Sequence, residues 1–189
     1  MKILLTGTTG YIGKRLLPLL LKKGHQLVCC VRDIDRFSYK AEKSDQLEVI
    51  EVDFLKENTL DIIPKDIEYA FYLIHSMSSP EGNFDQLESV SASNFKNVIN
   101  KTSASQVIYL SGIVNSEHLS KHLSSRKNVE HILSTGTYHL TTLRAGIIVG
   151  SGSASFEIIR DLVEKLPVMI TPKWLHTKSQ PISIKDVIQ

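Results

Sequence analysis

Three glycines near the start of the chain, Gly7, Gly10 and Gly13, are spaced three residues apart between an apolar run and a leucine-rich stretch. The apolar run predicts a strand, and the leucine-rich stretch predicts a helix. A glycine-rich turn between a strand and a helix is the setting in which a dinucleotide can bind. The first glycine allows a tight turn, the second lets the backbone approach a pyrophosphate, and the third lets the helix pack close to the sheet. Backbone N–H groups and the positive end of the helix dipole would meet the phosphates. The alternative is a turn without a ligand. The loop residues expected at the ligand are Thr6, Gly7, Thr9, Gly10, Tyr11, Ile12 and Gly13.

Strand-like and helix-like segments alternate along the whole chain. Between the strand-like runs, apolar residues recur every three or four positions, as in 84–99, which predicts helices. This alternation indicates a parallel sheet with right-handed crossovers and helices on both faces, so we expect one doubly wound α/β domain. The predicted strands are short, rich in Val, Ile, Leu and Tyr, and cover 2–6, 26–31, 47–52, 69–74, 106–111 and 140–145.

Composition excludes several classes of protein. The 189 residues carry a formal net charge of +2, with basic and acidic side chains scattered, so no basic face indicates a nucleic-acid partner. No apolar run approaches the ~20 residues that cross a bilayer, and the N-terminus lacks the pattern of a signal peptide. The two cysteines, Cys29 and Cys30, are adjacent, so they point to opposite faces of a predicted strand. We expect both side chains to be reduced and buried. We expect a cytoplasmic protein without a membrane span.

The glycine loop "TGTTGYIG" resembles the cofactor loop of the extended and atypical short-chain dehydrogenase/reductase superfamily. The set of motifs is similar to its NmrA-like, NAD(P)H-binding branch, and within it to bacterial proteins of the YbjT type, over about residues 1–188. The resemblance implies a Rossmann-like fold in one NAD(P)-binding domain over 1–189, with a C-terminal substrate portion that is short or missing. The further motifs are "VRD" (31–33), "VDF" (52–54), "YLIHSM" (72–77), "LRAGIIVGSGSASFE" (143–157) and "ITPKWLHTKSQPISIKDV" (170–187).

The end of the second predicted strand bears on which dinucleotide binds. An acidic side chain there binds the ribose 2′-hydroxyl of NAD, whereas an arginine accommodates the 2′-phosphate of NADP. By the resemblance, Val31 takes the place of the usual acid, and Arg32 follows with a guanidinium that can fork to phosphate and stack on adenine. Two alternatives stay open, because Asp33 could pair with Arg32 or repel the phosphate, and Arg32 could be a solvated charge. We expect NADP(H) to be favoured over NAD(H).

Residues after the third and fourth strands are expected at the same edge, because ligands of a doubly wound sheet lie beyond the carboxyl ends of its strands. Asp53, followed by Phe54, resembles the superfamily's contact to the adenine amino group, and a helix N-cap is its alternative role. His75 and Ser76 should border the pyrophosphate or the nicotinamide ribose, unless the histidine makes only a structural hydrogen bond.

The usual proton-transfer pair of the superfamily, Tyr-x-x-x-Lys on the helix after the fifth strand, does not occur in that region of this sequence. Counting back from "NVEHIL" (128–133), which resembles "EVEELL" in related proteins, places His122 at the tyrosine and Arg126 at the lysine. Residues four apart share a helix face, and histidine can donate a proton near neutral pH. Alternatively, both are surface residues on a helix that has lost its catalytic pair.

Three further residues complete the expected site. Ser111 ends the fifth strand and either contacts substrate or only terminates the strand. By the resemblance, Arg144 and Ala145 flank the nicotinamide ring, with a buried ion pair as the other role open to the arginine. No metal site is expected, since His118 and His122 lack both the intervening glutamate of a zinc helix and a third ligand.

Two functions of different classes follow. One is an NAD(P)-dependent oxidoreductase or isomerase of an unknown small molecule, in which His122 donates the proton, Arg126 holds the ribose, and Ser76 or Ser111 lies near the substrate. The other is a non-catalytic module that senses the dinucleotide and acts through a protein partner, as the resemblance to NmrA-like proteins implies. Homodimerisation through the helix over 84–102 is expected by fold analogy.

Overall fold

The structure is a computed structural model that describes residues 1–39, 44–75, 84–113, 121–166 and 178–189. Its internal contacts divide the chain into two compact units, Met1–Leu143 and Arg144–Gln189. The single domain expected over 1–189 stays a prediction.

A six-stranded sheet forms the centre of the first unit, in the order β3-β2-β1-β4-β5-β6. Strand β1 lies in the middle of the sheet and pairs in parallel with β2 on one side and with β4 on the other. The strands that follow β1 therefore extend the sheet first on one side and then on the other. This is the doubly wound arrangement, and it confirms the predicted Rossmann-like α/β fold. The strands are β1 (Lys2–Leu5), β2 (Gln26–Val31), β3 (Leu47–Glu51), β4 (Tyr69–Tyr72), β5 (Gln106–Gly112) and β6 (His139–Ala145).

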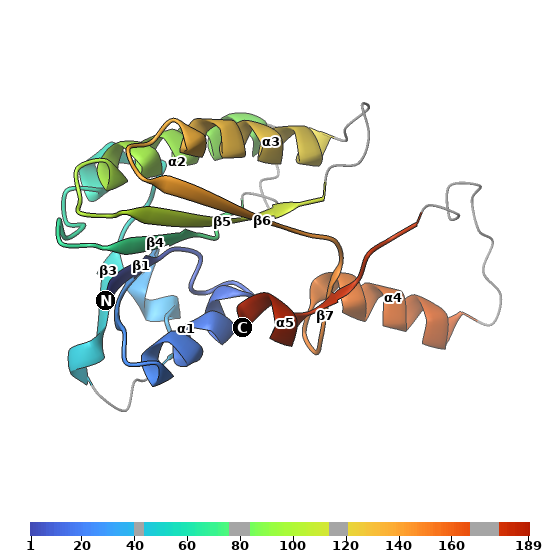
Figure 1. Cartoon of the computed structure of the whole chain (residues 1–189). Coiled ribbons are helices and arrows are strands. Elements are labelled where there is room, and N and C mark those ends of the chain that lie inside the picture. The colour runs from blue at the N-terminus through green and yellow to red at the C-terminus, as the bar shows by residue number, and fades with distance from the viewer. Residues whose placement is uncertain (40–43, 76–83, 114–120, 167–177) are drawn as a thin grey trace. The chain divides into compact units, whose positions relative to one another are not determined.

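Helices cover both faces of this sheet (Figure 1). Helix α1 (Gly13–Lys22) lies on one face, and α2 (Phe84–Ile99) and α3 (Lys121–Ser134) pack together on the other. Helix α2 has the predicted boundaries, because its apolar residues keep the helical period from end to end. Short 3₁₀ turns follow β2, precede β3 and follow β3: η1 (Ile34–Arg36), η2 (Ser44–Gln46) and η3 (Glu57–Thr59).

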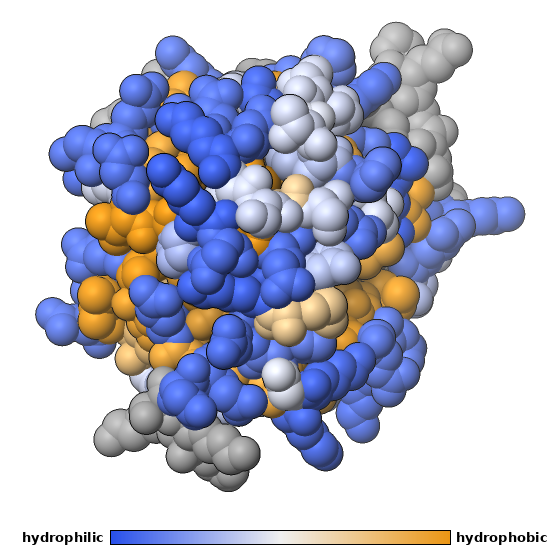
Figure 2. Space-filling model, turned by 60° about the vertical axis from the view of Figure 1, so that its left-hand side comes forward, coloured by the Kyte–Doolittle hydropathy of each residue, from blue (hydrophilic) through white to orange (hydrophobic). Residues whose placement is uncertain are grey.

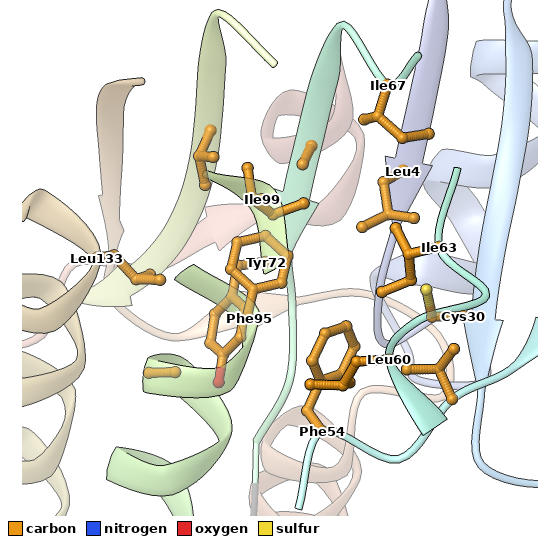
Figure 3. Close-up of a cluster of buried hydrophobic side chains, with 14 of the residues drawn as sticks. Leu4, Cys30, Phe54, Leu60, Ile63, Ile67, Tyr72, Phe95, Ile99 and Leu133 are labelled. Carbon is orange, nitrogen blue, oxygen red and sulfur yellow. The ribbon is translucent and has the colours of Figure 1, made fainter. Parts of the chain in front are cut away.

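The hydrophobic core fills the space between the sheet and the α2 and α3 layer (Figure 3). Tyr72 of β4 meets Phe95 of α2 edge to face, with ring centroids 4.8 Å apart. The Tyr72 hydroxyl is buried and lies 3.1 Å from the Ser91 hydroxyl, so the polar end of the ring keeps a hydrogen bond. This packing fixes α2, the helix that carries Leu87, Glu88 and Ser91, against the carboxyl end of β4.

Two short parallel strands, β7 (Ile148–Val149) and β8 (Ile182–Ser183), anchor the second unit. Helix α4 (Ala154–Lys165) follows β7, and α5 (Ile184–Ile188) follows β8. The Ser183 side chain accepts a hydrogen bond from the amide of Lys185 at 3.1 Å, which caps α5.

Hydrophilic side chains separate smaller hydrophobic areas on the face of the molecule shown in Figure 2. In the described part of the chain, no helix has the length and apolar character needed to span a membrane. Cys29 and Cys30 are buried and unpaired within β2, as expected for reduced side chains, and burial raises the pKa of the Cys29 thiol to about 12.

Candidate functional site

A pocket of about 680 Å³ lies at the carboxyl ends of β1, β2, β3 and β4. The strand ends meet there because parallel strands all finish at one edge of the sheet. The wall is formed by the glycine loop, the residues after three strands, and one side of α2. Its members are Thr6, Gly7, Thr9, Gly10, Tyr11, Ile12, Gly13, Cys30, Val31, Arg32, Val52, Asp53, Phe54, Leu55, Leu73, Ile74, His75, Leu87 and Ser91.

The three loop glycines are required for different reasons. Gly7 has φ +64°, and a Cβ there would strike the carbonyl oxygen of Leu73. A Cβ on Gly13 would strike the carbonyl oxygen of Gly7 and come within 2.8 Å of the Thr8 Cα. A Cβ on Gly10 would meet a single atom, the Gly7 oxygen, at 3.1 Å. The fold therefore demands glycine at Gly7 and Gly13, whereas at Gly10, on the pocket wall, a Cβ would be crowded by one atom that a shift of a few tenths of an ångström relieves.

The N-terminus of α1 has features that favour binding of an anion. Among the described residues, the amides of Tyr11, Ile12 and Gly13 have no hydrogen-bond acceptor. The helix has no side-chain cap, and its first turn contains no acidic residue. Unpaired amides and the positive helix end favour a bound negative group.

Tyr11 carries two further features of this loop. The Arg15 guanidinium lies 3.8 Å above its ring and donates a hydrogen bond to its carbonyl at 3.0 Å. The Tyr11 hydroxyl is buried and has no hydrogen-bond partner in the described part of the chain. A buried hydroxyl normally finds a partner, so this group is an exception within the loop. Sequence reasoning missed Arg15, although its spacing of four from Tyr11 was a usable signal.

Thr6 joins the loop to the neighbouring strand. Its hydroxyl donates to the carbonyl of Phe71 at 2.9 Å and accepts from the amide of Leu73 at 3.0 Å. This side-chain bridge takes the place of further strand pairing, which is why β1 and β4 end earlier than the predicted 2–6 and 69–74. The residues after Tyr72 are thereby directed along the pocket wall.

The residues after β2 show which side chain pairs with Asp33. Its carboxylate accepts the amide of Asp35 at 3.0 Å, capping η1, and pairs with Arg36 Nε at 3.1 Å. Arg32 is exposed and lines the pocket. The ion pair of Asp33 is thus made with Arg36, which offsets part of the negative charge next to Arg32.

Asp53 and Phe54 are placed at the pocket by local hydrogen bonds. The Asp53 carboxylate accepts the amide of Leu55 at 3.0 Å, which is a turn within the loop, whereas η3 begins after Lys56. The carbonyl of Phe54 accepts a hydrogen bond from Asn94 Nδ2 at 2.8 Å. Phe54 is buried in the core and also lies on the pocket wall.

His75 follows β4 at the pocket wall and lies near a buried carboxylate. Its Nδ1 is 3.8 Å from Glu88 Oε1 on α2. The other carboxylate oxygen accepts a hydrogen bond from the hydroxyl of Ser125 on α3 at 2.5 Å. Sequence reasoning missed Glu88, because only the packing of α2 against β4 and α3 brings these groups together. Ser76, expected beside His75, lies outside the described residues.

The three residues expected to be catalytic are not on the wall of this pocket within the described residues. His122 stacks on Phe84, with ring centroids 4.6 Å apart and planes at 22°. The Arg126 side chain lies against Gly112 at the end of β5, where Nη1 is 3.6 Å from the position of an added Cβ.

Ser111 precedes Gly112 and is buried. Two residues earlier, the Tyr109 hydroxyl donates a hydrogen bond to the carbonyl of Arg126 at 3.3 Å, and burial raises the pKa of this tyrosine to about 12. Arg126 and Ser111 therefore both lie at the end of β5. Arg144 and Ala145 end β6 within the second unit, and His118 falls outside the described residues.

Comparison with solved structures finds the same fold in several enzymes. The chain is similar to UDP-glucose 4-epimerase of Thermotoga maritima (15% identity, TM-score 0.74, covering 100% of this chain and 71% of that one). It is similar to WbmG of Bordetella bronchiseptica, solved with NAD (15%, TM-score 0.77, 100% and 66%). It is also similar to UDP-glucuronic acid 4-epimerase of Bacillus cereus, solved with UDP-glucuronic acid and NAD (18%, TM-score 0.72, 100% and 71%). These identities show the fold alone.

Sequence comparison supplies the family. No curated protein matches the chain. A family model described as the NAD dependent epimerase/dehydratase family matches residues 3–140, which is most of the chain and includes the whole pocket wall. This agrees with the resemblance to the extended short-chain dehydrogenase/reductase superfamily, whereas the narrower NmrA-like branch stays a prediction. The chain belongs to the NAD dependent epimerase/dehydratase family.

Proposed function

We propose that the pocket binds a nicotinamide dinucleotide and that the protein is an oxidoreductase of the epimerase/dehydratase type acting on a small molecule. Gly10 is the observation that carries this proposal. An added Cβ there would meet one atom, the Gly7 oxygen at 3.1 Å, so the fold could take alanine after a shift of a few tenths of an ångström, and a glycine is nevertheless present. A pyrophosphate that must come close to the backbone of the loop accounts for the missing Cβ. Membership of a family described as NAD dependent supports the same ligand.

The residues of the loop fit a dinucleotide. The amides of Tyr11, Ile12 and Gly13 would bind the pyrophosphate together with the positive end of α1. Asp53, after β3, would receive the adenine amino group. When bound, the nicotinamide ring accepts or donates a hydride.

The choice of dinucleotide depends on Arg32. We propose that its guanidinium binds the 2′-phosphate of NADP(H), since it is exposed on the pocket wall and the charge of Asp33 is offset by Arg36. NAD(H) is the competing ligand, because WbmG and the Bacillus cereus enzyme were each solved with NAD. Titration of both dinucleotides against the wild-type protein and Arg32→Ala decides between them.

For proton transfer we propose His122, with Arg126 holding a ribose hydroxyl and Ser111 near the substrate. His122 and Arg126 lie one helical turn apart on α3, and the Arg126 side chain reaches the end of β5 beside Ser111. A substrate that spans the pocket and this strand end would meet both groups. UDP sugars are the first acceptors to test, because UDP-glucose and UDP-glucuronic acid are named for the neighbours.

The second candidate is a dinucleotide-sensing module without turnover. It is favoured by one observation: within the described residues, the pocket wall lacks His122 and Arg126, which replace the usual catalytic pair. The decisive experiment follows NADPH or NADH absorbance with and without UDP sugars, carbonyls and quinones. Acceptor-dependent oxidation supports the oxidoreductase. Tight dinucleotide binding with no oxidation by any acceptor supports the sensor.

A further inference from the structure

Glu88 is a carboxylate inside the protein that the proposed reaction does not use. Its residue is 6% exposed, and acidic side chains are seldom buried to this degree unless they are paired. The carboxylate joins three elements, because Oε1 faces His75 after β4 at 3.8 Å and Oε2 holds the Ser125 hydroxyl of α3 at 2.5 Å. A buried group of this kind requires a physical reason, since burial of a charge is costly.

Geometry indicates what Glu88 does to His75. The ring nitrogen nearest the carboxylate is Nδ1, at 3.8 Å from Oε1, which is within ion-pair range and longer than a hydrogen bond. The negative charge of the carboxylate on this side favours the tautomer that carries its proton on Nδ1, and that tautomer leaves Nε2 as an acceptor at the other edge. His75 lines the pocket, and its side chain is 31% exposed, so a ligand can reach it.

We propose that Glu88 is a positioning residue that fixes the orientation and tautomer of His75, so that Nε2 is the nitrogen offered to a hydroxyl group of the bound ligand. The hydroxyl of a nucleotide ribose has the required chemistry, because it can donate a hydrogen bond to an unprotonated Nε2. This step rests on the proposed function, since it names a contact within the same pocket.

The Ser125 hydrogen bond serves a separate purpose. It occupies the second oxygen of Glu88 and connects the carboxylate to α3, one residue before Arg126. Removing Ser125 alone should leave Oε1 beside His75. Ser125→Ala is therefore a matched control that disturbs the same carboxylate without removing its negative charge from beside Nδ1.

The test uses the full chain labelled with ¹⁵N at its histidines, with the His75 signals assigned by their loss in His75→Asn. Neutral imidazole tautomers differ in their ¹⁵N shifts, and an unconstrained ring prefers the proton on Nε2. The informative variant is Glu88→Met combined with Ser125→Ala, because replacing both partners of a buried hydrogen bond by apolar groups costs little stability. We expect His75 to carry its proton on Nδ1 in wild type and Ser125→Ala, and on Nε2 in the double variant.

Dinucleotide affinity provides the second readout. The double variant should bind about tenfold more weakly, the loss of one hydrogen bond to the ligand, whereas Ser125→Ala should bind as wild type does. A proton on Nε2 in the wild type, or an unchanged tautomer in the double variant, overturns the positioning role. Equal affinities for the wild type and the double variant overturn the ligand contact. A wild type that binds neither dinucleotide but keeps the proton on Nδ1 overturns the proposed function instead.

Discussion

Alanine at Gly10 and alanine at Gly13 should have opposite consequences, although the two glycines are three residues apart. At Gly13 the new Cβ would strike the Gly7 carbonyl and approach the Thr8 Cα to 2.8 Å, so the backbone must move. Overpacking of this kind costs about 1–3 kcal/mol, and the better helix propensity of alanine returns at most ~1 kcal/mol. At Gly10 the Cβ meets one oxygen at 3.1 Å, which a small shift relieves.

We therefore expect Gly13→Ala to lower the free energy of unfolding by about 1–2 kcal/mol, which is a decrease of roughly 2–8 °C in Tm for a chain of this size. Gly10→Ala should change Tm by less than ~2 °C but weaken dinucleotide binding about 10- to 100-fold, because a methyl group stands where the pyrophosphate must approach. Thermal unfolding by circular dichroism and fluorescence titration with NADPH measure the two effects.

If Gly10→Ala unfolds as readily as Gly13→Ala, the single contact at Gly10 costs as much as the clashes at Gly13, which contradicts the expected difference. Wild-type dinucleotide affinity in Gly10→Ala contradicts the ligand contact, because the glycine would then serve neither fold nor ligand.

Three other predictions follow from the site. Arg32→Ala should weaken NADPH binding about tenfold or more and leave NADH binding nearly unchanged, as measured by parallel titrations; an equal loss for both ligands contradicts the 2′-phosphate contact. His122→Ala should lower acceptor-dependent turnover about 10²-fold or more without altering dinucleotide affinity, and an unchanged rate removes the histidine from the mechanism. Because burial raises the pKa of Tyr109 from 10.0 to about 12, the folded state keeps a proton that the unfolded chain loses. The free energy of unfolding should thus decline as pH rises from 10 towards 12, and less steeply in Tyr109→Phe; identical slopes in urea titrations would contradict this.

The fold was predictable because local sequence agrees with it at each level. Strand β2 occupies the predicted 26–31 and helix α2 the predicted 84–99, since continuous apolar runs and helical periodicity are unambiguous there. The end of β4 was predicted two residues too late. Leu73 and Ile74 are apolar, which predicts strand. In the structure the amide of Leu73 donates a hydrogen bond to the Thr6 hydroxyl, and the pairing of β1 with β4 ends there.

The candidate site was predictable only where residues close together in the sequence form it. Gly7 and Gly13 were visible because a positive φ and close backbone contacts require glycine wherever they occur. Glu88 was not, because its proposed role depends on the closeness of its carboxylate to His75, which follows strand β4. The stacking of His122 on Phe84 was equally hidden, since it depends on how α3 packs against α2.

The central claim is that this pocket binds a nicotinamide dinucleotide, and direct titration of the wild-type chain with NADPH and NADH tests it. We expect saturable binding of one dinucleotide per chain, tighter for NADPH, and competition by the matching oxidised form. If neither dinucleotide binds at millimolar concentration to a chain shown to be folded, the glycine loop serves only the fold and the account is wrong.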